Sequence, residues 1–334
     1  MSDKAKPNVD PDLILSSQVA QALTVIVDRW AFMIIHDIYL GVRQFEELRR
    51  RSGAARGTLA SRLKKLVQQG ILYRNPYQGA PVRYEYRLTD KGLDLYPVVL
   101  TMWLWESKWG QGRNLPPDLI HKSCGQTMHA LFRCKTCHAD VMPQDVVFTP
   151  GHDASIAKKV PARFQRRSRA SNQHGEGEDA FTVFSVIGDR WTSLLIAAAF
   201  FGLQRYDDIV SSIGIATNIL ADRLKFLVSA GVLVRKPYQH RPLRYEYHLS
   251  DKGRDLYANT IAMHEWADRW LIEKGKEPLL LRHTPCDSRF ESELVCSECE
   301  RPLQPSDVSY DREPRHNSLF MKVNRINRAE QRHG

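Results

Sequence analysis

Long apolar runs are missing from this sequence. Nowhere in its 334 residues does a stretch approach the run of about 20 apolar residues that a membrane-spanning helix requires. The first residues, MSDKAKPNVDPDLIL, also lack the basic and then apolar regions of a secretory signal peptide. We therefore expect a cytoplasmic protein with no membrane partner.

Motifs of common enzyme classes are absent as well. The sequence contains no nucleophile elbow, no phosphate-binding loop and no glycine-rich dinucleotide fingerprint. These motifs place a nucleophile, a phosphate or a dinucleotide, and no other group of residues in the sequence replaces them. We expect no enzymatic activity.

Cysteine is scarce and confined to two places. The six cysteines lie at 124, 134 and 137 and at 286, 296 and 299. A disulfide framework usually spreads its cysteines through a short secreted chain, and three per group is an odd number for pairing. Metal ligation is the better interpretation of both groups.

Negative charge is in deficit. The formal net charge is +10 and the pI is about 9.3. Such a balance favours a polyanionic partner, because each phosphate that a basic side chain neutralises releases counterions. Charge alone is consistent with a nucleic-acid partner without establishing one.

One long phrase occurs twice. PYQGAPVRYEYRLTDKG (76–92) recurs as PYQHRPLRYEYHLSDKG (237–253), and the same shift of 161 residues aligns DRW at 28–30 with DRW at 189–191. Beyond that span the shift becomes 162, and the cysteines of the two groups then coincide. A period this long indicates duplicated domains, since solenoid repeats usually run about 20 to 50 residues.

The repeat divides the chain into units. We predict an α+β, mainly helical protein with two winged helix-turn-helix domains, each followed by a small zinc-ribbon-like module. The predicted order is a winged domain at 12–112, a module at 117–148, a basic flexible linker at 149–178, a second winged domain at 179–274, a second module at 279–310 and a basic tail at 311–334.

Helical periodicity dominates the first part of each copy. In copy one the pattern predicts one or two helices from Leu13 to Leu40, a short helix in FEELRRRSG that ends at Gly53, and a third helix from Gly57 to Gln69. The last two, joined by a short turn, resemble a helix-turn-helix.

The third helix has an apolar side and a basic side. Apolar residues at 59, 63, 66 and 67 form the side that faces the core. The outward residues are Thr58, Ser61, Arg62, Lys64 and Lys65. An isolated basic helix is usually just solvated, whereas a recognition helix would use these residues in a DNA major groove.

A β-hairpin follows the third helix. ILYRNPY and VRYEYRLT are strand-like runs on either side of a Gln-Gly-Ala-Pro turn. In the second strand Tyr84, Tyr86 and Leu88 share one face, which we expect to face the core. Thr89 then begins a helix that leads into the tryptophan-rich segment before residue 112.

These elements in this order make a winged helix-turn-helix, and the residues resemble a known family. RW, FEEL, LASRLKKLVQQGILYR and PVRYEYRLTDKG in copy one, with DRW, YDDI, LADRLKFLVSAGVLVRK and PLRYEYHLSDKG in copy two, are similar to the HxlR-type bacterial transcriptional regulators. The resemblance covers about 200 residues across the two copies.

The resemblance implies a sequence-specific regulator that binds double-stranded DNA, which we expect to act as a repressor. Members of this family normally act as homodimers through their first and last helices. Two copies in one chain could form an intramolecular pseudo-dimer, with recognition helices about 34 Å apart in successive major grooves. The alternative is a homodimer of chains with four wings.

Several family members sense oxidants through a cysteine near the first helix, which this chain lacks. The two recognition helices also differ, because Thr58, Ser61 and Lys65 become Ile219, Asp222 and Phe226. We expect copy one to contribute more DNA affinity than copy two. The predicted DNA contacts are Arg56, Thr58, Ser61, Arg62, Lys64, Lys65, Arg74 and Arg83 in copy one and Asn218, Ile219, Asp222, Arg223, Lys225, Arg235 and Arg244 in copy two.

Each cysteine group has a histidine at a fixed distance. The predicted ligand sets are His121, Cys124, Cys134 and Cys137, and His283, Cys286, Cys296 and Cys299. His129 and His138 align with glutamates, so His121 and His283 are the better candidates. Three thiolates and an imidazole suit a closed, structural zinc site, and the alternative is a cysteine module without metal.

Other interpretations stay open. The chain could be a protein-interaction or assembly factor, for which the partly apolar recognition face of copy two is the best indication, or a zinc-thiolate regulator that responds to redox state or metal. Tryptophans 103, 105, 109 and 266 could line a pocket for a small-molecule effector, although such residues more often form a core or a dimer seam.

Overall fold

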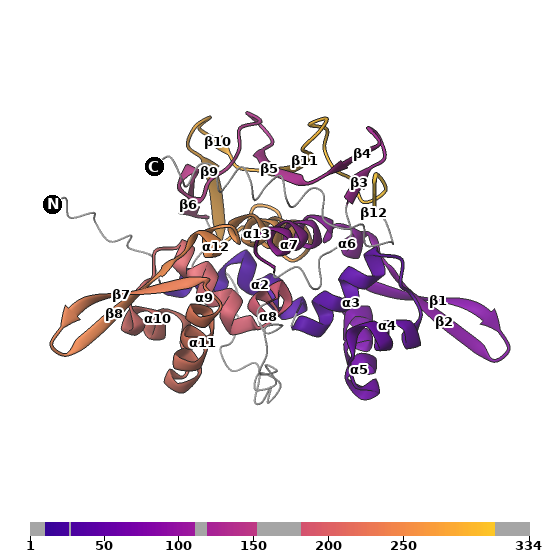
Figure 1. Cartoon of the computed structure of the whole chain (residues 1–334), viewed down its shortest axis with the longest axis horizontal. Helices are drawn as coiled ribbons and strands as arrows, with labels where there is room; N and C mark the ends of the chain where they lie inside the picture. The colour runs from indigo at the N-terminus through magenta and orange to yellow at the C-terminus, as the bar shows by residue number, and fades with distance from the viewer. Residues whose placement is uncertain (1–10, 27, 111–118, 152–181, 311–334) are drawn as a thin grey trace.

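The computed structural model of the chain describes residues 11–26, 28–110, 119–151 and 182–310 (Figure 1). Most of the predicted linker and the whole predicted tail lie outside these ranges. The described part of the chain is a mixed α+β protein in three tiers: two helix-turn-helix units with their wings, a central pair of long helices, and small antiparallel sheets on the other side of that pair (Figure 1).

Copy one begins with three helices where the sequence predicted one or two. Its elements are α1 (Pro11–Ser16), α2 (Gln18–Val25), α3 (Arg29–Tyr39), α4 (Phe45–Ser52), α5 (Arg56–Gln68), β1 (Leu72–Gly79), β2 (Val82–Leu88), α6 (Asp90–Leu93), α7 (Tyr96–Trp109), β3 (Leu119–His121), β4 (Gln126–Met128), β5 (Ala130–Cys134), η1 (Pro143–Asp145) and β6 (Val146–Pro150).

Copy two repeats this order from α2 onward, and its described residues include no counterpart of α1 or η1. Its elements are α8 (Val183–Ile187), α9 (Arg190–Phe200), α10 (Tyr206–Ile213), α11 (Thr217–Ser229), β7 (Leu233–His240), β8 (Leu243–Leu249), α12 (Asp251–Arg254), α13 (Tyr257–Trp270), β9 (Leu279–His283), β10 (Ser288–Arg289), β11 (Ser292–Cys296) and β12 (Val308–Tyr310).

Local capping explains where several helices begin and end. Asp28 accepts the backbone N–H groups of Trp30 and Ala31 at 3.1 Å each, and Thr89 accepts that of Gly92. Gly53 ends α4 in the left-handed conformation that glycine adopts without steric cost, as the sequence predicted. The short turn between α4 and α5 completes the helix-turn-helix.

The wing corrects one sequence prediction. β1 and β2 pair antiparallel, and Tyr86 and Leu88 pack partly against the core as expected. Tyr84, however, is 43% exposed. The hairpin extends beyond the helices, so no second layer covers either face at Tyr84, and alternation alone does not bury a side chain there.

The two copies exchange their first helices. α1 contacts α10 and α2 contacts α13, so the N-terminal helices of copy one pack on copy two. In return α8 contacts α3 and α7, and the Val183 backbone N–H donates to the Glu106 carboxylate at 2.7 Å. Burial raises the pKa of Glu106. A single apolar core therefore spans both winged units.

The central helices α7 and α13 form a seam with reciprocal bonds. Trp105 donates from Nε1 to the Lys252 carbonyl at 2.9 Å, and Trp266 donates to the Lys91 carbonyl at 3.0 Å. The Trp109 and Trp270 indoles likewise donate across the seam, to Asp255 at 2.6 Å and Asp94 at 2.7 Å. Trp105, Trp109 and Trp266 thus lie in a seam between the copies, whereas Trp103 donates to His36 of its own copy at 2.8 Å.

The small sheets also join the copies. β5 pairs with β11, β3 lies between β4 and β12, and β9 lies between β10 and β6. Each of the three sheets therefore contains strands of both copies. Thr149 and Pro150, assigned from the sequence to the linker, belong to β6.

Among the described helices, none is by itself long and apolar enough to cross a membrane. α2 and α3 meet the length and composition test only as a pair, and the two helices are bent by 79°. Most of their apolar side chains are buried in the core.

Candidate nucleic-acid interface and metal clusters

The recognition helices α5 and α11 lie on the same side of the molecule, away from the small sheets, and the two wings extend in opposite directions (Figure 1). Leu59, Leu63 and Leu66 anchor α5 in the core, and Leu220, Leu224 and Leu227 do the same for α11. The opposite face of each helix is thereby left toward solvent.

The predicted DNA contacts fall into two groups by exposure. The exposed ones are Arg56, Ser61, Lys64, Arg74, Arg83, Asn218, Asp222, Lys225, Arg235 and Arg244. The half-buried ones are Thr58, Arg62, Lys65, Ile219 and Arg223. Burial lowers the pKa of Lys65, and the neighbouring Arg62 charge acts in the same direction. The exposed group is the one open to solvent.

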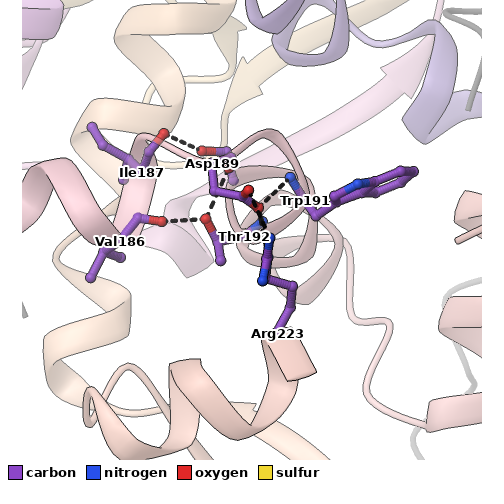
Figure 2. Close-up of polar contacts among 7 residues, drawn as sticks. Val186, Ile187, Asp189, Trp191, Thr192 and Arg223 are labelled. Atoms are coloured by element: carbon purple, nitrogen blue, oxygen red, sulfur yellow. Dashed lines mark hydrogen bonds and ion pairs between the residues drawn. The ribbon is translucent and has the colours of Figure 1, made fainter. Parts of the chain in front are cut away.

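Arg62 and Arg223 have partners within the protein. Arg223 forms two bonds to the Asp189 carboxylate, at 2.9 and 3.1 Å, and Asp189 also caps α9 through Trp191 and Thr192 (Figure 2). Arg62 forms an ion pair, through Nε, with the corresponding aspartate Asp28, the cap of α3. Both pairs tie a recognition helix to the start of the helix behind it. Sequence reasoning missed this role, although DRW recurs in both copies.

Aromatic rings hold basic side chains on the wings. The Arg74 guanidinium lies 5.2 Å from the centre of the Tyr84 ring, and Arg235 lies 4.7 Å from that of Tyr245. Stacking of this kind restricts a long side chain without neutralising it. Each wing thus presents a positioned arginine, and the exposure of Tyr84 serves that arrangement.

The face of α11 is less apolar toward solvent than its sequence indicated. Ile219 and Phe226 pack partly against the core. The preceding helix α10 carries Asp207 and Asp208 but no basic residue, and Asp207 pairs with Arg244 at 3.3 Å. The best indication for a protein-docking face on copy two is weakened accordingly.

Further exposed basic residues were not among the sequence predictions. They include Arg49, Arg50 and Arg51 on α4, and Lys236, His240 and Arg241 on the wing of copy two. The excess of basic over acidic residues in these segments was the signal that could have identified them.

The structure brings all eight predicted metal ligands together but regroups them. One cluster contains His121, Cys124, Cys296 and Cys299, and the other contains Cys134, Cys137, His283 and Cys286. The sequence assigned the four ligands of one copy to one site, and this grouping is wrong. The histidines in these clusters are His121 and His283, not His129 or His138. The physical reason is the strand exchange, which places β5 beside β11.

The ligand atoms of each cluster lie within 4.8 Å of one another. In the first cluster the His121 Nδ1 atom lies 3.2 and 3.5 Å from the sulfurs of Cys299 and Cys124, and the Cys124 and Cys296 sulfurs are 3.9 Å apart. A disulfide would require about 2.05 Å. Ligands about 2.3 Å from a tetrahedral ion would lie about 3.8 Å apart, close to the observed spacing.

The second cluster has the same geometry. The His283 Nδ1 atom lies 3.3 Å from the Cys286 sulfur and 3.5 Å from that of Cys137, and the Cys134 and Cys286 sulfurs are 3.9 Å apart. The hydrogen bond with His283 lowers the pKa of the Cys286 thiol to about 6. Both histidine rings are fully buried. Either cluster could hold a metal ion.

The backbone is strained at these clusters. Within the described ranges, the non-glycine residues with positive φ are His138, Asp287 and Glu300, at 54° to 60°. Each directly follows a cysteine of a cluster, and Gly125, at 70°, follows Cys124. Left-handed conformations of non-glycine residues concentrate at functional sites, where other interactions hold them in place.

Known proteins are similar to parts of this chain. An HTH-type transcriptional regulator of Mycobacterium tuberculosis is 34% identical over 134 residues, which are 40% of this chain and 85% of that protein. The HTH-type transcriptional regulator YodB of Bacillus subtilis is 33% identical over 90 residues, 27% of this chain and 80% of YodB. These relatives are described as transcriptional regulators.

Solved structures give matches of the same extent. A candidate transcription factor from Pseudomonas aeruginosa, PA1374, is 29% identical to this chain. The match covers 41% of this chain and 93% of the PA1374 chain, with a TM-score of 0.33. The reduced form of YodB is 34% identical, and the match covers 26% of this chain and 87% of the YodB chain, with a TM-score of 0.24.

A family model described as HxlR-like helix-turn-helix matches residues 25–114 and again residues 186–275. The two matches coincide with the two winged units and together cover more than half of the chain. The chain therefore belongs to the HxlR-like helix-turn-helix family of transcriptional regulators and carries two copies of the family's domain.

Proposed function

We propose that this protein binds specific double-stranded DNA sequences as an intramolecular pseudo-dimer and represses the genes beside them. The observation that carries the proposal is the placement of α5 and α11 on one side of a single core, joined by reciprocal bonds across α7 and α13 (Figure 1). One chain thereby supplies the two recognition helices that a two-part DNA site requires.

The two copies use different parts of their surface. α4 and α5 contain seven basic residues and two acidic ones, whereas α10 and α11 contain two basic and three acidic. The two wings differ by only one basic residue: the wing of copy two has four, Arg235, Lys236, Arg241 and Arg244, and that of copy one has three, each wing with one acidic residue. In copy two the wing is therefore basic while the helices are not. We infer that copy one engages DNA mainly through its helices and copy two mainly through its wing.

Selection of bound fragments from genomic DNA tests the proposed function. The chain should enrich fragments that share a motif, and binding to a selected fragment should weaken steeply with salt and exceed binding to a shuffled fragment. Salt-dependent binding without preference for the selected fragment would be non-specific adhesion and would contradict the proposal. Repression is tested by a reporter gene placed behind the selected site.

We also propose that the two clusters hold zinc in structural sites. Three sulfurs and one imidazole nitrogen at tetrahedral spacing make a donor set typical of zinc, and four protein ligands leave no open position for water. Zinc analysis of protein prepared under reducing conditions should give two ions per chain. A content near zero would remove the zinc proposal without touching the DNA-binding one.

A further inference from the structure

Each cluster takes two ligands from one copy and two from the other. Copy one supplies a histidine and a cysteine to one cluster and a Cys-x-x-Cys pair to the other, and copy two does the reverse. We propose that the two metal ions are clasps between the repeats, so that each ion links segments that are 172 to 178 residues apart at the first cluster and 146 to 152 at the second.

The strands around the clusters place the ligands for this exchange. β5 ends at Cys134 and β11 ends at Cys296, and these strands pair antiparallel with Cys134 opposite Ser292 and Cys296 opposite Ala130. The two cysteines therefore lie at opposite ends of one two-stranded ribbon. Each faces the His-x-x-Cys segment of the other copy, because β3 and β9 lie beyond the two ends (Figure 1).

The clasps are attached to the seam helices. Around the first cluster, Cys296 and Leu294 pack in one apolar group with Leu100 and Trp103 of α7. Around the second, Cys134 and Phe290 pack with Tyr257 and Ile261 of α13. The ligand strands of both copies thus cover the helices that connect the wings, and an ion in each cluster would fix the two copies on these helices.

The bonds across the ribbon support the same arrangement. Arg133 of copy one pairs with Glu300 of copy two at 3.1 Å, and Lys135 pairs with Glu291 at 3.0 Å. The Ser297 backbone N–H donates to the His129 carbonyl at 3.0 Å. These contacts surround the ligands without taking a ligand atom, so they hold the exchanged register independently of a metal.

Double variants of ligand residues distinguish shared from local sites, with zinc counted on the folded chain by native mass spectrometry. Cys124→Ser with Cys296→Ser removes ligands of one shared cluster and should leave one zinc. Cys124→Ser with Cys134→Ser removes a ligand from each cluster and should leave none. If each copy instead held its own zinc, the first double variant would leave none and the second would leave one, and that result would overturn the proposal. His129→Gln, at an exposed non-ligand histidine, should retain two.

The wild-type chain provides a second measurement that does not depend on folding of a variant. Limited chelation followed by alkylation should release thiols in the sets 124, 296, 299 and 134, 137, 286. Release in the sets 124, 134, 137 and 286, 296, 299 would refute the clasp. Neither experiment involves DNA, so the clasp can fail while the proposed regulator function stands, and the reverse is equally possible.

Discussion

Arg62 and Arg223 are the residues whose role the structure defines most sharply. Each lies on a recognition helix, yet each is bonded to the aspartate that caps the helix behind it. An arginine held in this way sets the angle of the recognition helix and reaches a phosphate only by giving up its partner. Lys64 is exposed and lies in a helix without acidic residues, so it is the better phosphate contact.

Comparison of Arg62→Ala with Lys64→Ala separates these roles. Loss of a phosphate contact at Lys64 should lower the slope of log affinity against log salt by about 1. Arg62→Ala should lower affinity for the selected site while leaving the salt slope nearly unchanged, because no phosphate contact is lost. The check is fluorescence anisotropy over a salt series. Equal drops in slope for both variants would show that Arg62 contacts phosphate.

Asp189 should matter for stability as well as for geometry. Asp189→Ala removes an N-cap and the partner of Arg223, and we expect a loss of about 1 to 2 kcal/mol in the free energy of unfolding. Asp222→Ala, at an exposed position on α11, should change it by less than about 0.5 kcal/mol. Denaturant unfolding measures both, and similar values would contradict the capping role.

The sequence predicted on which side of an element a residue lies, but not which distant side chain it contacts. Helical spacing placed Arg62 on the outer flank of its helix correctly, but nothing near it in the sequence points to Asp28, 34 residues earlier. Tyr84 was placed on an inward face because alternation is the only sequence signal for burial, and it does not report where a sheet lacks a second layer.

The elements that define the family unit were predictable because each carries local signals. Gly53 marks the end of α4, Thr89 the start of α6, and the leucines of α5 its buried side. The three helices at the start of copy one were harder to separate. α2 and α3 share an apolar pattern, and only the cap at Asp28 shows where the second of them begins.

The seam between α7 and α13 depends on two buried indoles. Trp266 is 2% exposed, and Trp266→Phe removes its bond to the Lys91 carbonyl, so we expect a loss of about 1 kcal/mol or slightly more in stability. Trp270→Phe removes the exposed bond of the same seam, to Asp94, at a 37% exposed position and should cost less than about 0.5 kcal/mol. Chemical denaturation compares the two variants, and an equal effect would show that burial does not determine how much each bond across the seam stabilises the protein.

The two recognition helices should differ in how much they contribute to DNA affinity. Lys64 and Lys225 are exposed at equivalent positions, but Lys64 lies in a helix without acidic residues and Lys225 follows Asp222. Lys64→Ala should weaken binding to the selected site by about 1 kcal/mol, or about fivefold, and Lys225→Ala by less. Equal losses, measured at one salt concentration, would contradict the inferred division of labour between helix and wing.

At the scale of the whole molecule the two copies exchange their first helices and their metal-ligand strands, and reciprocal bonds between the seam helices join them. The sequence could not show this, because every ligand in copy one has a chemically identical counterpart in copy two, and both groupings satisfy the same spacing. The exchange means that neither copy closes its own core or its own cluster. A duplicated chain has in this way become one structural unit.

The proposed function depends most on one chain providing both halves of the DNA-binding unit. Sedimentation equilibrium of the complex with a selected DNA site, combined with footprinting, tests it directly. We predict one chain per DNA, protecting two half-sites about 34 Å apart or at a multiple of that distance. Two chains on the same two half-sites, or protection of a single half-site by one chain, would contradict the account.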